Sequence, residues 1–388
     1  MSILIKPYPQ WLAPALFALA LAGCESDESF SLGGTVTGPT GNGFELTHKD
    51  EKITVVGKSF TFEQRLADGD AYNVRLTQDP NQQLCQLANA SGRVSGRDVK
   101  DIEVRCRGWR GEAILTTTGT TFSQQIALDS EGNGLVVWST TVDDQPLARI
   151  YSAKTNTWSE PKLLSEGVDS SEALIMQVAF APDGNALVVW LDEGDDESYI
   201  VSQRYLAASN GFETAEIISA EGRRIDGAFL RFAIDAEGNA IAVWIDDEDD
   251  DAIIVANHYN ANDGKWLKEP IALYTSTGND LSSPDIAFDP AGNAMLVWQE
   301  GFNSGTASRL LSLHYLIENA SEPKQGWSQN ALEILPSHSV DPDGFMFGPE
   351  IAIDAEGNAL IAWAHNSDLF GADTDSSIRY SRSSSTTE

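Results

Sequence analysis

Cysteine, histidine and basic residues are all scarce in this chain of 388 residues. It has three cysteines, five histidines and 25 Lys and Arg residues against 58 Asp and Glu residues, so its formal net charge is −33 at pH 7. A field of this sign repels nucleic acid and anionic lipid headgroups, which argues against both as partners. The apolar and aromatic contents, 41% and 9%, are those of a globular protein and exclude a disordered chain.

Long apolar runs are also lacking, with one exception near the N-terminus. The run Trp11–Ala22 follows a single cation at Lys6 and is well short of the ~20 residues that a helix needs to span a bilayer. A short apolar run between a positive charge and small residues is typical of a secretory signal. Residues 1–23 are therefore predicted to be a signal peptide rather than a transmembrane anchor.

The signal ends in Leu21-Ala22-Gly23-Cys24, which resembles the lipobox of bacterial lipoproteins. The resemblance implies cleavage before Cys24, a lipid on this cysteine, and a mature chain anchored to a membrane of the bacterial cell envelope. The outer membrane is the expected one, with the protein facing the periplasm or the cell surface. Residues 24–29 then form a short polar tether.

Cys85 and Cys106 are the two cysteines that remain. Two remaining cysteines in a chain exported to an oxidising compartment predict one disulfide between them. A metal site is the alternative, but it would need further ligands, and the histidines are scattered over positions 48, 258, 314, 338 and 365.

Residues 30–106 consist of short alternating segments separated by Gly, Asn and Asp, which predict a small antiparallel β-sandwich. The disulfide would link its last two strands and, by the chain-entropy estimate, add roughly 3 kcal/mol to a small core. The stretch resembles the small Ig-like or prealbumin-like modules that follow the lipobox in many bacterial lipoproteins. The resemblance implies a spacer.

Residues 107–388 carry almost all of the acidity, with 15 basic and 45 acidic residues, and repeat one sequence pattern five times. The copies are IALDSEGNGLVVWST from Ile126, VAFAPDGNALVVWLD from Val178, FAIDAEGNAIAVWID from Phe232, IAFDPAGNAMLVWQE from Ile286 and IAIDAEGNALIAWAH from Ile351. Each copy predicts a β-hairpin. The nearly continuous apolar run that contains the Trp predicts a second strand buried on both faces.

Turn residues occupy the centre of each copy. A Gly is present in all five, as expected where the chain must take a left-handed conformation, at positions 132, 184, 238, 292 and 357. The Asp three residues earlier suits the first position of a type I turn, but the second copy has Ala181 there. A role in the turn is therefore favoured over a catalytic role for this Asp.

Further aromatic residues mark two more strands in each unit. A Tyr follows each Trp (138, 190, 244, 298 and 363), at positions 151, 205, 259, 315 and 380, and a second aromatic residue follows the first four Tyr, at 158, 212, 266 and 327. Four strands in about 50 residues are typical of one blade of a β-propeller. The fifth unit lacks the fourth strand, and Trp109–Leu115 matches its pattern. The sequence predicts an all-β, monomeric chain: a sandwich followed by a five-bladed propeller, residues 107–388, whose last blade this N-terminal strand closes.

The repeat resembles bacterial propeller proteins of the sialidase-like, BNR-repeat kind in its blade layout. The Asp-box of that group, S-x-D-x-G-x-x-W, is not matched: no Ser stands two residues before the Asp, and Trp138 is six positions after Gly132, where the box has three. An arginine triad cannot be placed either, since Arg204 and Arg379 adjoin the third-strand Tyr. No catalytic residue is assigned, and a sialidase-like propeller glycosidase or lyase is kept as the alternative function.

The regular Tyr and Trp residues are interpreted as packing residues rather than as a glycan-stacking array. His258 and His314 precede the Tyr of their units and are expected to face outward from separate blades, too far apart to share a metal.

Acidic runs fill the expected loops between second and third strands, which all emerge on one face of a propeller. A solvated surface is the simplest interpretation. None of the runs matches the D-x-[DN]-x-[DN]-G calcium loop, so at most weak Ca²⁺ binding is expected and no cofactor is required. The candidate metal ligands are Asp192, Glu193, Asp195, Asp196, Asp246, Asp247, Asp249 and Asp250.

These patterns favour a lipid-anchored, non-enzymatic envelope protein. In this hypothesis the sandwich is a spacer, and the propeller binds an envelope protein, a glycan or a cation through its loop face.

Overall fold

The computed structural model describes most of the chain between Glu28 and Ser383. The described residues are 28–38, 43–78, 83–108, 114–116, 119–140, 145–168, 172–193, 197–222, 225, 229–248, 251–302, 308–319, 323–335, 345–366 and 376–383. They are nearly all-β, and the chain divides into two compact units between Ile114 and Leu115. No helix within these ranges is long and apolar enough to cross a membrane.

The N-terminal unit contains two four-stranded sheets, β5-β2-β10-β8 and β4-β3-β7-β9, and a short pair, β1-β6. The strands are β1 (Ser29–Phe30), β2 (Leu32–Thr37), β3 (Phe44–His48), β4 (Glu51–Val55), β5 (Ser59–Thr61), β6 (Leu66–Ala67), β7 (Ala71–Gln78), β8 (Gln83–Ala88), β9 (Ser91–Arg93) and β10 (Val99–Gly108). Alternate side chains of both larger sheets, among them Leu32, Leu46 and Ile102, form one core. The β2–β10 pair is parallel, so the expectation of a purely antiparallel unit is wrong at this pair.

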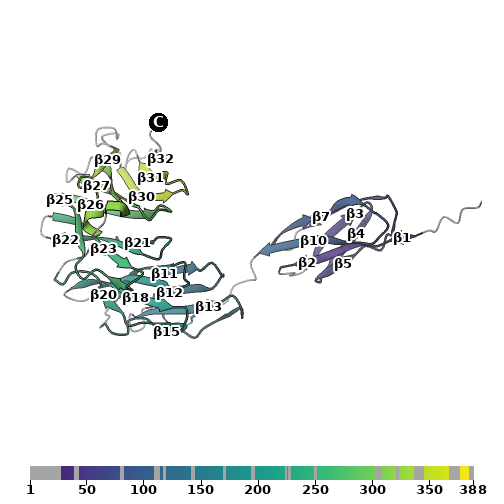
Figure 1. Cartoon of the computed structure of the whole chain (residues 1–388), viewed down its shortest axis with the longest axis horizontal. Helices are drawn as coiled ribbons and strands as arrows, with labels where there is room; N and C mark the ends of the chain where they lie inside the picture. Colours follow the sequence, from purple (N-terminus) through teal and green to yellow (C-terminus); the bar gives the residue numbers. More distant parts are fainter. Residues whose placement is uncertain are drawn as a thin grey trace, which may run out of the picture. The chain divides into compact units, whose positions relative to one another are not determined.

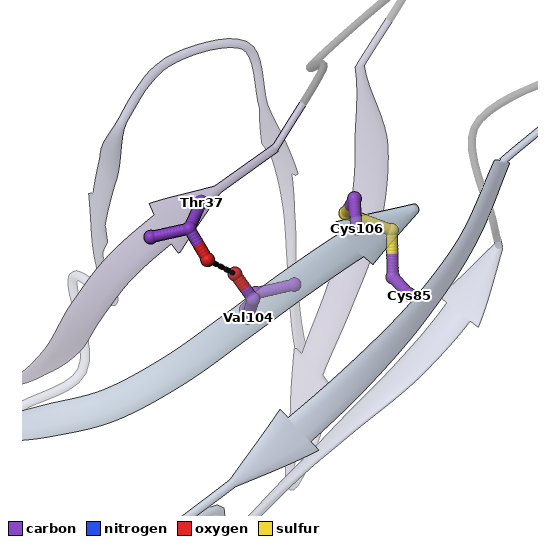
Figure 2. Close-up of a disulfide and its surroundings, with 4 residues drawn as sticks. All are labelled: Thr37, Cys85, Val104 and Cys106. Atoms are coloured by element: carbon purple, nitrogen blue, oxygen red, sulfur yellow. Dashed lines mark hydrogen bonds between the residues drawn. A yellow bond between two sulfur atoms is a disulfide. The ribbon is translucent and has the colours of Figure 1, made fainter. Parts of the chain in front are cut away.

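Cys85 and Cys106 form the predicted disulfide. They stand opposite each other on the antiparallel strands β8 and β10, with their Cα atoms 4.0 Å apart (Figure 2). On the other side of β10, the Thr37 hydroxyl of β2 donates a hydrogen bond to the Val104 carbonyl. Because β9 lies between β8 and β10 along the chain, the disulfide joins neighbouring strands of one sheet and not the last two strands in sequence.

Within the described ranges, the C-terminal unit contains five antiparallel sheets, here called the first to the fifth in chain order. The first has β11 (Thr121–Leu128), β12 (Gly134–Thr140), β13 (Pro146–Ser152), β14 (Thr157–Trp158) and β15 (Lys162–Leu163); the second has β16 (Ala173–Phe180), β17 (Ala186–Glu193), β18 (Ser198–Leu206), β19 (Gly211–Phe212) and β20 (Glu216–Ile217). The third has β21 (Arg231–Ile234), β22 (Ala240–Glu248), β23 (Asp251–Asn260), β24 (Lys265–Trp266) and β25 (Ile271–Thr277). The fourth has β26 (Asn279–Phe288), β27 (Ala294–Phe302), β28 (Ser308–Tyr315) and β29 (Leu332–Leu335), with a 3₁₀ turn η1 (Ile317–Asn319) and a short helix α1 (Pro323–Gly326) before β29; the fifth has β30 (Phe345–Ile353), β31 (Ala359–Asn366) and β32 (Ser376–Ser383).

The five sheets follow one another face to face across the unit (Figure 1). The first strand of each sheet contacts the first strand of the next, from β11 through β16, β21 and β26 to β30. This is the layout of successive propeller blades. The second strands of the first four sheets are largely buried on both faces as predicted, but in β31 Leu360 is 48% exposed, so the prediction is wrong for the fifth sheet. The Trp side chains at 190, 244 and 298 have no exposed surface, which confirms their role in packing.

The fifth sheet differs from the other four. It has three strands, and no fourth strand completes it within the described ranges. Of the strand expected at Trp109–Leu115, residues 109–113 lie outside the described residues, and Ile114 and Leu115 are not in a strand, so the prediction is wrong for these two. Tyr380 is also not the equivalent of the other third-strand Tyr: it lies opposite Ala362, and Ser383 occupies the equivalent position.

The repeat turns are built by one set of hydrogen bonds. In the third sheet, Asp235 Oδ1 accepts from the backbone N–H of Glu237 and Asn239, and the Asn239 side chain donates to Asp235 Oδ2. Asn239 Oδ1 accepts from the N–H of Ala261 at 3.0 Å, which ties the turn to the end of β23. In the second copy, where Ala181 replaces the Asp, Asp183 bonds the Asn instead. The Asp therefore serves the turn, as expected.

The turn glycines take the left-handed conformation that the sequence predicts, with φ of 83°, 82°, 88°, 84° and 82° at Gly132, Gly184, Gly238, Gly292 and Gly357. At Gly238, an added Cβ would also lie 3.3 Å from Ala181 Cβ of the second sheet. Both the conformation and the contact select Gly at this position.

Replacing Gly238 by Ala is expected to lower the free energy of unfolding of the C-terminal unit by about 1 to 2 kcal/mol, because a left-handed conformation costs this much for a residue with a Cβ. All tryptophans other than Trp11 lie after residue 108, so thermal unfolding followed by Trp fluorescence reports on this unit. The matched control is Ala236→Ser in the same turn. Equal melting temperatures for Gly238→Ala and the control would contradict the prediction.

Candidate ligand-binding groove

Neighbouring sheets leave equivalent grooves beside the repeat turns. Each is lined by the turn of one sheet, by residues at the end of its third strand, and by the turn Gly and third-strand Tyr of the next sheet. The cavity volume is about 370 Å³ between the first and second sheets, about 20 Å³ between the second and third, and about 670 Å³ between the third and fourth. One repeated motif thus makes two open grooves and one closed groove.

The residue before the third-strand Tyr accounts for this difference. It is Ile150 in the first sheet, Arg204 in the second and His258 in the third, and each of them lines its groove. The Arg204 guanidinium reaches the third sheet, where Nη1 lies 2.8 Å from the position that a Cβ on Gly264 would take. The long Arg204 side chain therefore fills the groove that the shorter residues leave open.

His258 forms part of the wall of the open groove between the third and fourth sheets, here called the 3/4 groove. It is 8% exposed, its Nε2 accepts a hydrogen bond from Trp327 Nε1 at 2.9 Å, and burial lowers its pKa to about 4. The expectation that His258 faces outward is therefore wrong, because the ring is enclosed by the fourth sheet. His314, the equivalent residue of the fourth sheet, is half-buried, and burial lowers its pKa too.

The Trp327 hydrogen bond decides the tautomer of His258. The ring is neutral near pH 7, and the nitrogen that accepts carries no proton, so the proton is on Nδ1. No partner for Nδ1 is found among the described residues. His258, one of the residues that line the 3/4 groove, therefore has a ring N–H donor whose hydrogen bond is unused.

Tyr315 stands opposite His258, with the two ring centroids 5.0 Å apart. Its side chain is 8% exposed, and burial first, then the negative charge of Asp235, raises its pKa. Within the described part of the chain, its hydroxyl has no hydrogen-bond partner. In the groove between the first and second sheets, the equivalent Tyr205 hydroxyl donates to Asn210 Oδ1 at 2.9 Å. The phenol that is occupied in one groove is available in the other.

Charge distinguishes the two open grooves as well. The groove between the first and second sheets is lined by Asp129, Glu131 and Asp183, with no Lys or Arg among its lining residues. The 3/4 groove is lined by two acids, Asp235 and Asp263, and by Lys265 and Lys268. In a unit with a large acidic excess, the 3/4 groove is locally balanced and is more favourable to an anionic group.

The structure describes the strand ends next to the acidic loops that were predicted from the sequence. Asp192 and Asp246 are buried at the ends of β17 and β22, where they accept hydrogen bonds from Trp190 Nε1 at 3.3 Å and Trp244 Nε1 at 2.8 Å. Glu193 is exposed and Asp247 is half-buried. The other four candidate metal ligands, Asp195, Asp196, Asp249 and Asp250, lie outside the described residues, and no group of three or more His, Cys, Asp or Glu within the described ranges is placed to hold a metal.

A buried cluster around Glu300 occupies the equivalent strand end in the fourth sheet. Glu300 is 1% exposed and accepts hydrogen bonds from Tyr274, Ser276, Asn279 and Arg309. Burial alone would raise the pKa of Glu300, but these hydrogen bonds outweigh it and lower the pKa. The cluster was not predicted, although its signal is in the sequence: the second residue after the Trp is acidic in three successive copies.

Comparison with known proteins gives a likeness of fold. No protein-family model matches the chain, and no curated protein resembles it in sequence. Among solved structures, it resembles an endo-arabinase from Bacteroides thetaiotaomicron, with 13% identity, 66% of this chain and 92% of that chain covered, and a TM-score of 0.39. An α-L-arabinanase from Penicillium chrysogenum complexed with arabinobiose has 14% identity, coverage of 65% and 79%, and a TM-score of 0.42. The α-L-arabinofuranosidase Arb93A from Fusarium graminearum has 12% identity, coverage of 67% and 80%, and a TM-score of 0.42.

The buried His258 is expected to make stability depend on pH. Its pKa is about 4 in the folded chain and close to the ordinary 6.5 in the unfolded chain, so the unfolded chain binds more protons below pH 6.5. Stability is therefore lost as the pH falls from about 6.5 toward 4, by about 2 kcal/mol between pH 7 and pH 5.

Urea unfolding followed by Trp fluorescence at pH 7 and pH 5 measures this loss. The matched variant is His258→Gln, which retains an acceptor for Trp327 and has no titrating group. Between pH 7 and pH 5, this variant should lose about 2 kcal/mol less stability than the wild type. An identical pH dependence in both proteins would show that His258 is not the group responsible.

Proposed function

We propose that the chain is a lipid-anchored protein of the bacterial cell envelope whose propeller binds a ligand in the 3/4 groove. The observation that carries the proposal is the contrast between this groove, with about 670 Å³, and its equivalent of about 20 Å³ that Arg204 fills. Ligand sites are typically concave, a few hundred Å³ or more in volume, and combine apolar walls with a few polar groups. Phe288, His258 and Tyr315 supply such a combination.

The anchoring part of the proposal rests on the N-terminal sequence. Residues 1–27, with the signal and Cys24, lie outside the described residues. We propose a lipid on Cys24, attachment to the outer membrane, and the N-terminal unit as a spacer between the anchor and the propeller. The partner is then a component of the envelope that reaches the 3/4 groove, with a glycan favoured over a protein because the groove is a small, concave site rather than a flat surface.

We also propose that the five sheets close into a ring. Ile126 and Leu128 lie on the face of the first sheet that points away from the second, and they are 62% and 63% exposed. Leu360, Ile378 and Tyr380 lie on the face of the fifth sheet that points away from the fourth, and they are 48%, 77% and 74% exposed. Ile286, the equivalent of Ile126 inside the row of sheets, is only 6% exposed.

The row of sheets thus has an exposed apolar face at each end. These two faces can pack against each other and form a fifth interface between sheets. Closure would bury both faces, and Trp109–Leu115 would then pair with the free edge of β32 as the missing strand. A second copy of the chain is the other possible cover, because interfaces that join unlike faces produce rings or open filaments.

The acidic face is proposed to bind divalent cations weakly, or a cationic partner. Carboxylates that cannot separate repel one another, and a bound cation removes several of these repulsions. Affinity in the ~0.1 to 1 mM range of extracellular modules is expected, since the runs lack the calcium-loop pattern.

A propeller glycosidase or lyase is the second candidate. The observation that favours it is the acid at the same strand-end position in three neighbouring sheets, Asp192, Asp246 and Glu300, with Arg309 beside the last. Glycoside hydrolysis uses a pair of carboxyl groups. The same experiment can test both candidates, since hydrolysis or elimination leaves shortened glycans.

Ligand binding is tested by incubating the immobilised chain from Glu25 onward, which has both compact units, with a library of envelope oligosaccharides, with and without millimolar calcium. Mass spectrometry identifies the bound compounds.

The blocking variant is His258→Arg, which places an Arg in the 3/4 groove, as Arg204 stands in the neighbouring groove between the second and third sheets. The control is Arg204→His. We expect binding to the wild type and the control and a loss of at least tenfold in His258→Arg. Retention by His258→Arg would place the site elsewhere, and shortened glycans would establish the enzyme alternative.

Ring closure is tested by introducing a charge into one end face. Ile126→Asp is expected to lower stability by several kcal/mol if the fifth sheet covers Ile126, because an unpaired charge is then buried, and by little if the face is open. Leu163→Asp, at a residue that is 52% exposed on β15, is the matched control. Thermal unfolding and the mass in solution are measured together. Equal stability of the two variants contradicts closure, and a concentration-dependent mass shows that a second copy covers the faces.

A further inference from the structure

The 3/4 groove differs from the groove between the first and second sheets in the kind of hydrogen-bonding group that it leaves without a partner. In the latter, the Tyr205 hydroxyl is bonded to Asn210 and the lining charges are all negative. In the 3/4 groove, His258 Nδ1–H and the Tyr315 hydroxyl have no partner among the described residues, and two ammonium groups, of Lys265 and Lys268, stand among the lining residues. The unused groups are therefore mainly donors.

A site made of unused donors selects a ligand that is rich in acceptors. A ring N–H, a phenol and two ammonium groups can together satisfy a carboxylate and neighbouring hydroxyl or ring oxygens, and donors that carry a charge make the stronger hydrogen bonds. The lining has two lysines and two aspartates and therefore no net charge, so it accommodates one carboxylate more readily than several.

The apolar lining indicates the shape of the ligand. Phe288 and Ile317 come from the fourth sheet and Leu267 from the third, so the groove has apolar surface on both walls beside the polar groups. A sugar ring presents C–H faces to such walls and oxygen atoms along its edge. A flexible aliphatic carboxylate would leave the separate donors unsatisfied, at a cost for each that is buried.

The lysines are a departure from the repeat. Trp158, Phe212 and Trp266 are equivalent, so Lys265 replaces Thr157 and Gly211, and Lys268 replaces Glu160 and Thr214. The turn and the sheet are built in the first and second sheets without a cation at either position. Their presence in the third sheet is not required by the fold.

We propose that the 3/4 groove binds a sugar that carries one carboxylate, a uronic acid, at the end of an oligosaccharide or alone. The carboxylate lies against Lys265 and Lys268, and the ring oxygens accept from His258 Nδ1 and the Tyr315 hydroxyl. This proposal rests on the function proposed above, because it names the ligand class of the same groove.

Titration calorimetry at constant ionic strength with the chain from Glu25 onward tests the proposal. The probes are digalacturonic acid, its neutral counterpart galactobiose, and sodium acetate as the carboxylate alone. Digalacturonic acid is expected to bind at least tenfold more tightly than either of the others.

Equal binding of the two disaccharides would overturn the carboxylate requirement and leave the proposed groove function intact. Binding of acetate as tight as that of digalacturonic acid would overturn the sugar, and binding of neither disaccharide by a chain that retains other oligosaccharides would overturn the ligand class alone.

Matched variants then locate the contacts. Tyr315→Phe removes only the hydroxyl, and its control is Tyr205→Phe in the groove between the first and second sheets. Lys268→Gln removes one charge from the lining, and its control is Lys162→Gln, whose ammonium group donates to the Asn210 carbonyl outside the 3/4 groove. A loss of about three- to tenfold is expected for Tyr315→Phe and about tenfold or more for Lys268→Gln, with both controls unchanged.

His258→Gln keeps the acceptor for Trp327 and removes the Nδ1–H donor, so it should weaken binding without altering the fold seen by Trp fluorescence. Equal affinities of the groove variants and their controls would place the bound sugar outside the 3/4 groove.

Discussion

Face-to-face packing of successive β-sheets is the interaction on which the C-terminal unit depends. Each second strand is apolar on both sides, and residues such as Val188 and Trp190 on one side and Leu187 and Val189 on the other belong to the cores shared with the two neighbouring sheets. A sheet of this kind cannot be stable alone, because either face would expose apolar surface. The grooves, the buried acids and the exposed end faces all follow from this arrangement.

Burial at the strand ends explains why equivalent polar positions differ between sheets. The second residue after the Trp is enclosed in each of the first four sheets, and a polar group there must find a partner. Asp192 and Asp246 are short and accept from the indole of their own Trp. Glu300 is longer by one methylene and instead accepts from Arg309 and three neutral donors. The hydrogen bonds of the three acids therefore give each of them a structural role.

Differences between equivalent grooves arise from single side chains on a common scaffold. In each of the first four sheets, the side-chain oxygen of the turn Asn accepts a hydrogen bond from a backbone N–H just after the third strand, as at Asn133, Asn185, Asn239 and Asn293. On this repeated scaffold, the groove lined by Arg204 has a volume of about 20 Å³, whereas the grooves lined by Ile150 and His258 have about 370 Å³ and about 670 Å³.

The sequence alone determined the features that follow from local pattern. The disulfide, the short strands of the N-terminal unit, the five hairpins, the left-handed Gly of each turn and the burial of the Trp strands in the first four sheets were all predicted, because each depends on residue type and spacing within a few residues. The presence of Ala181 in the second copy also favoured a turn role over a catalytic role for the Asp, and in the structure Asp183 bonds the Asn there instead.

Only the tertiary structure decided which residues from different sheets meet. The sequence placed His258 outward because it cannot show that Trp327, 69 positions away, encloses the ring and donates to it. It took Tyr380 for a repeat Tyr because spacing along a chain does not reveal strand register, which Ala359 and Ser383 define. The parallel β2–β10 pair and the 3/4 groove likewise join segments distant in sequence. Contacts of this kind depend on packing between whole elements, and local pattern carries no information about them.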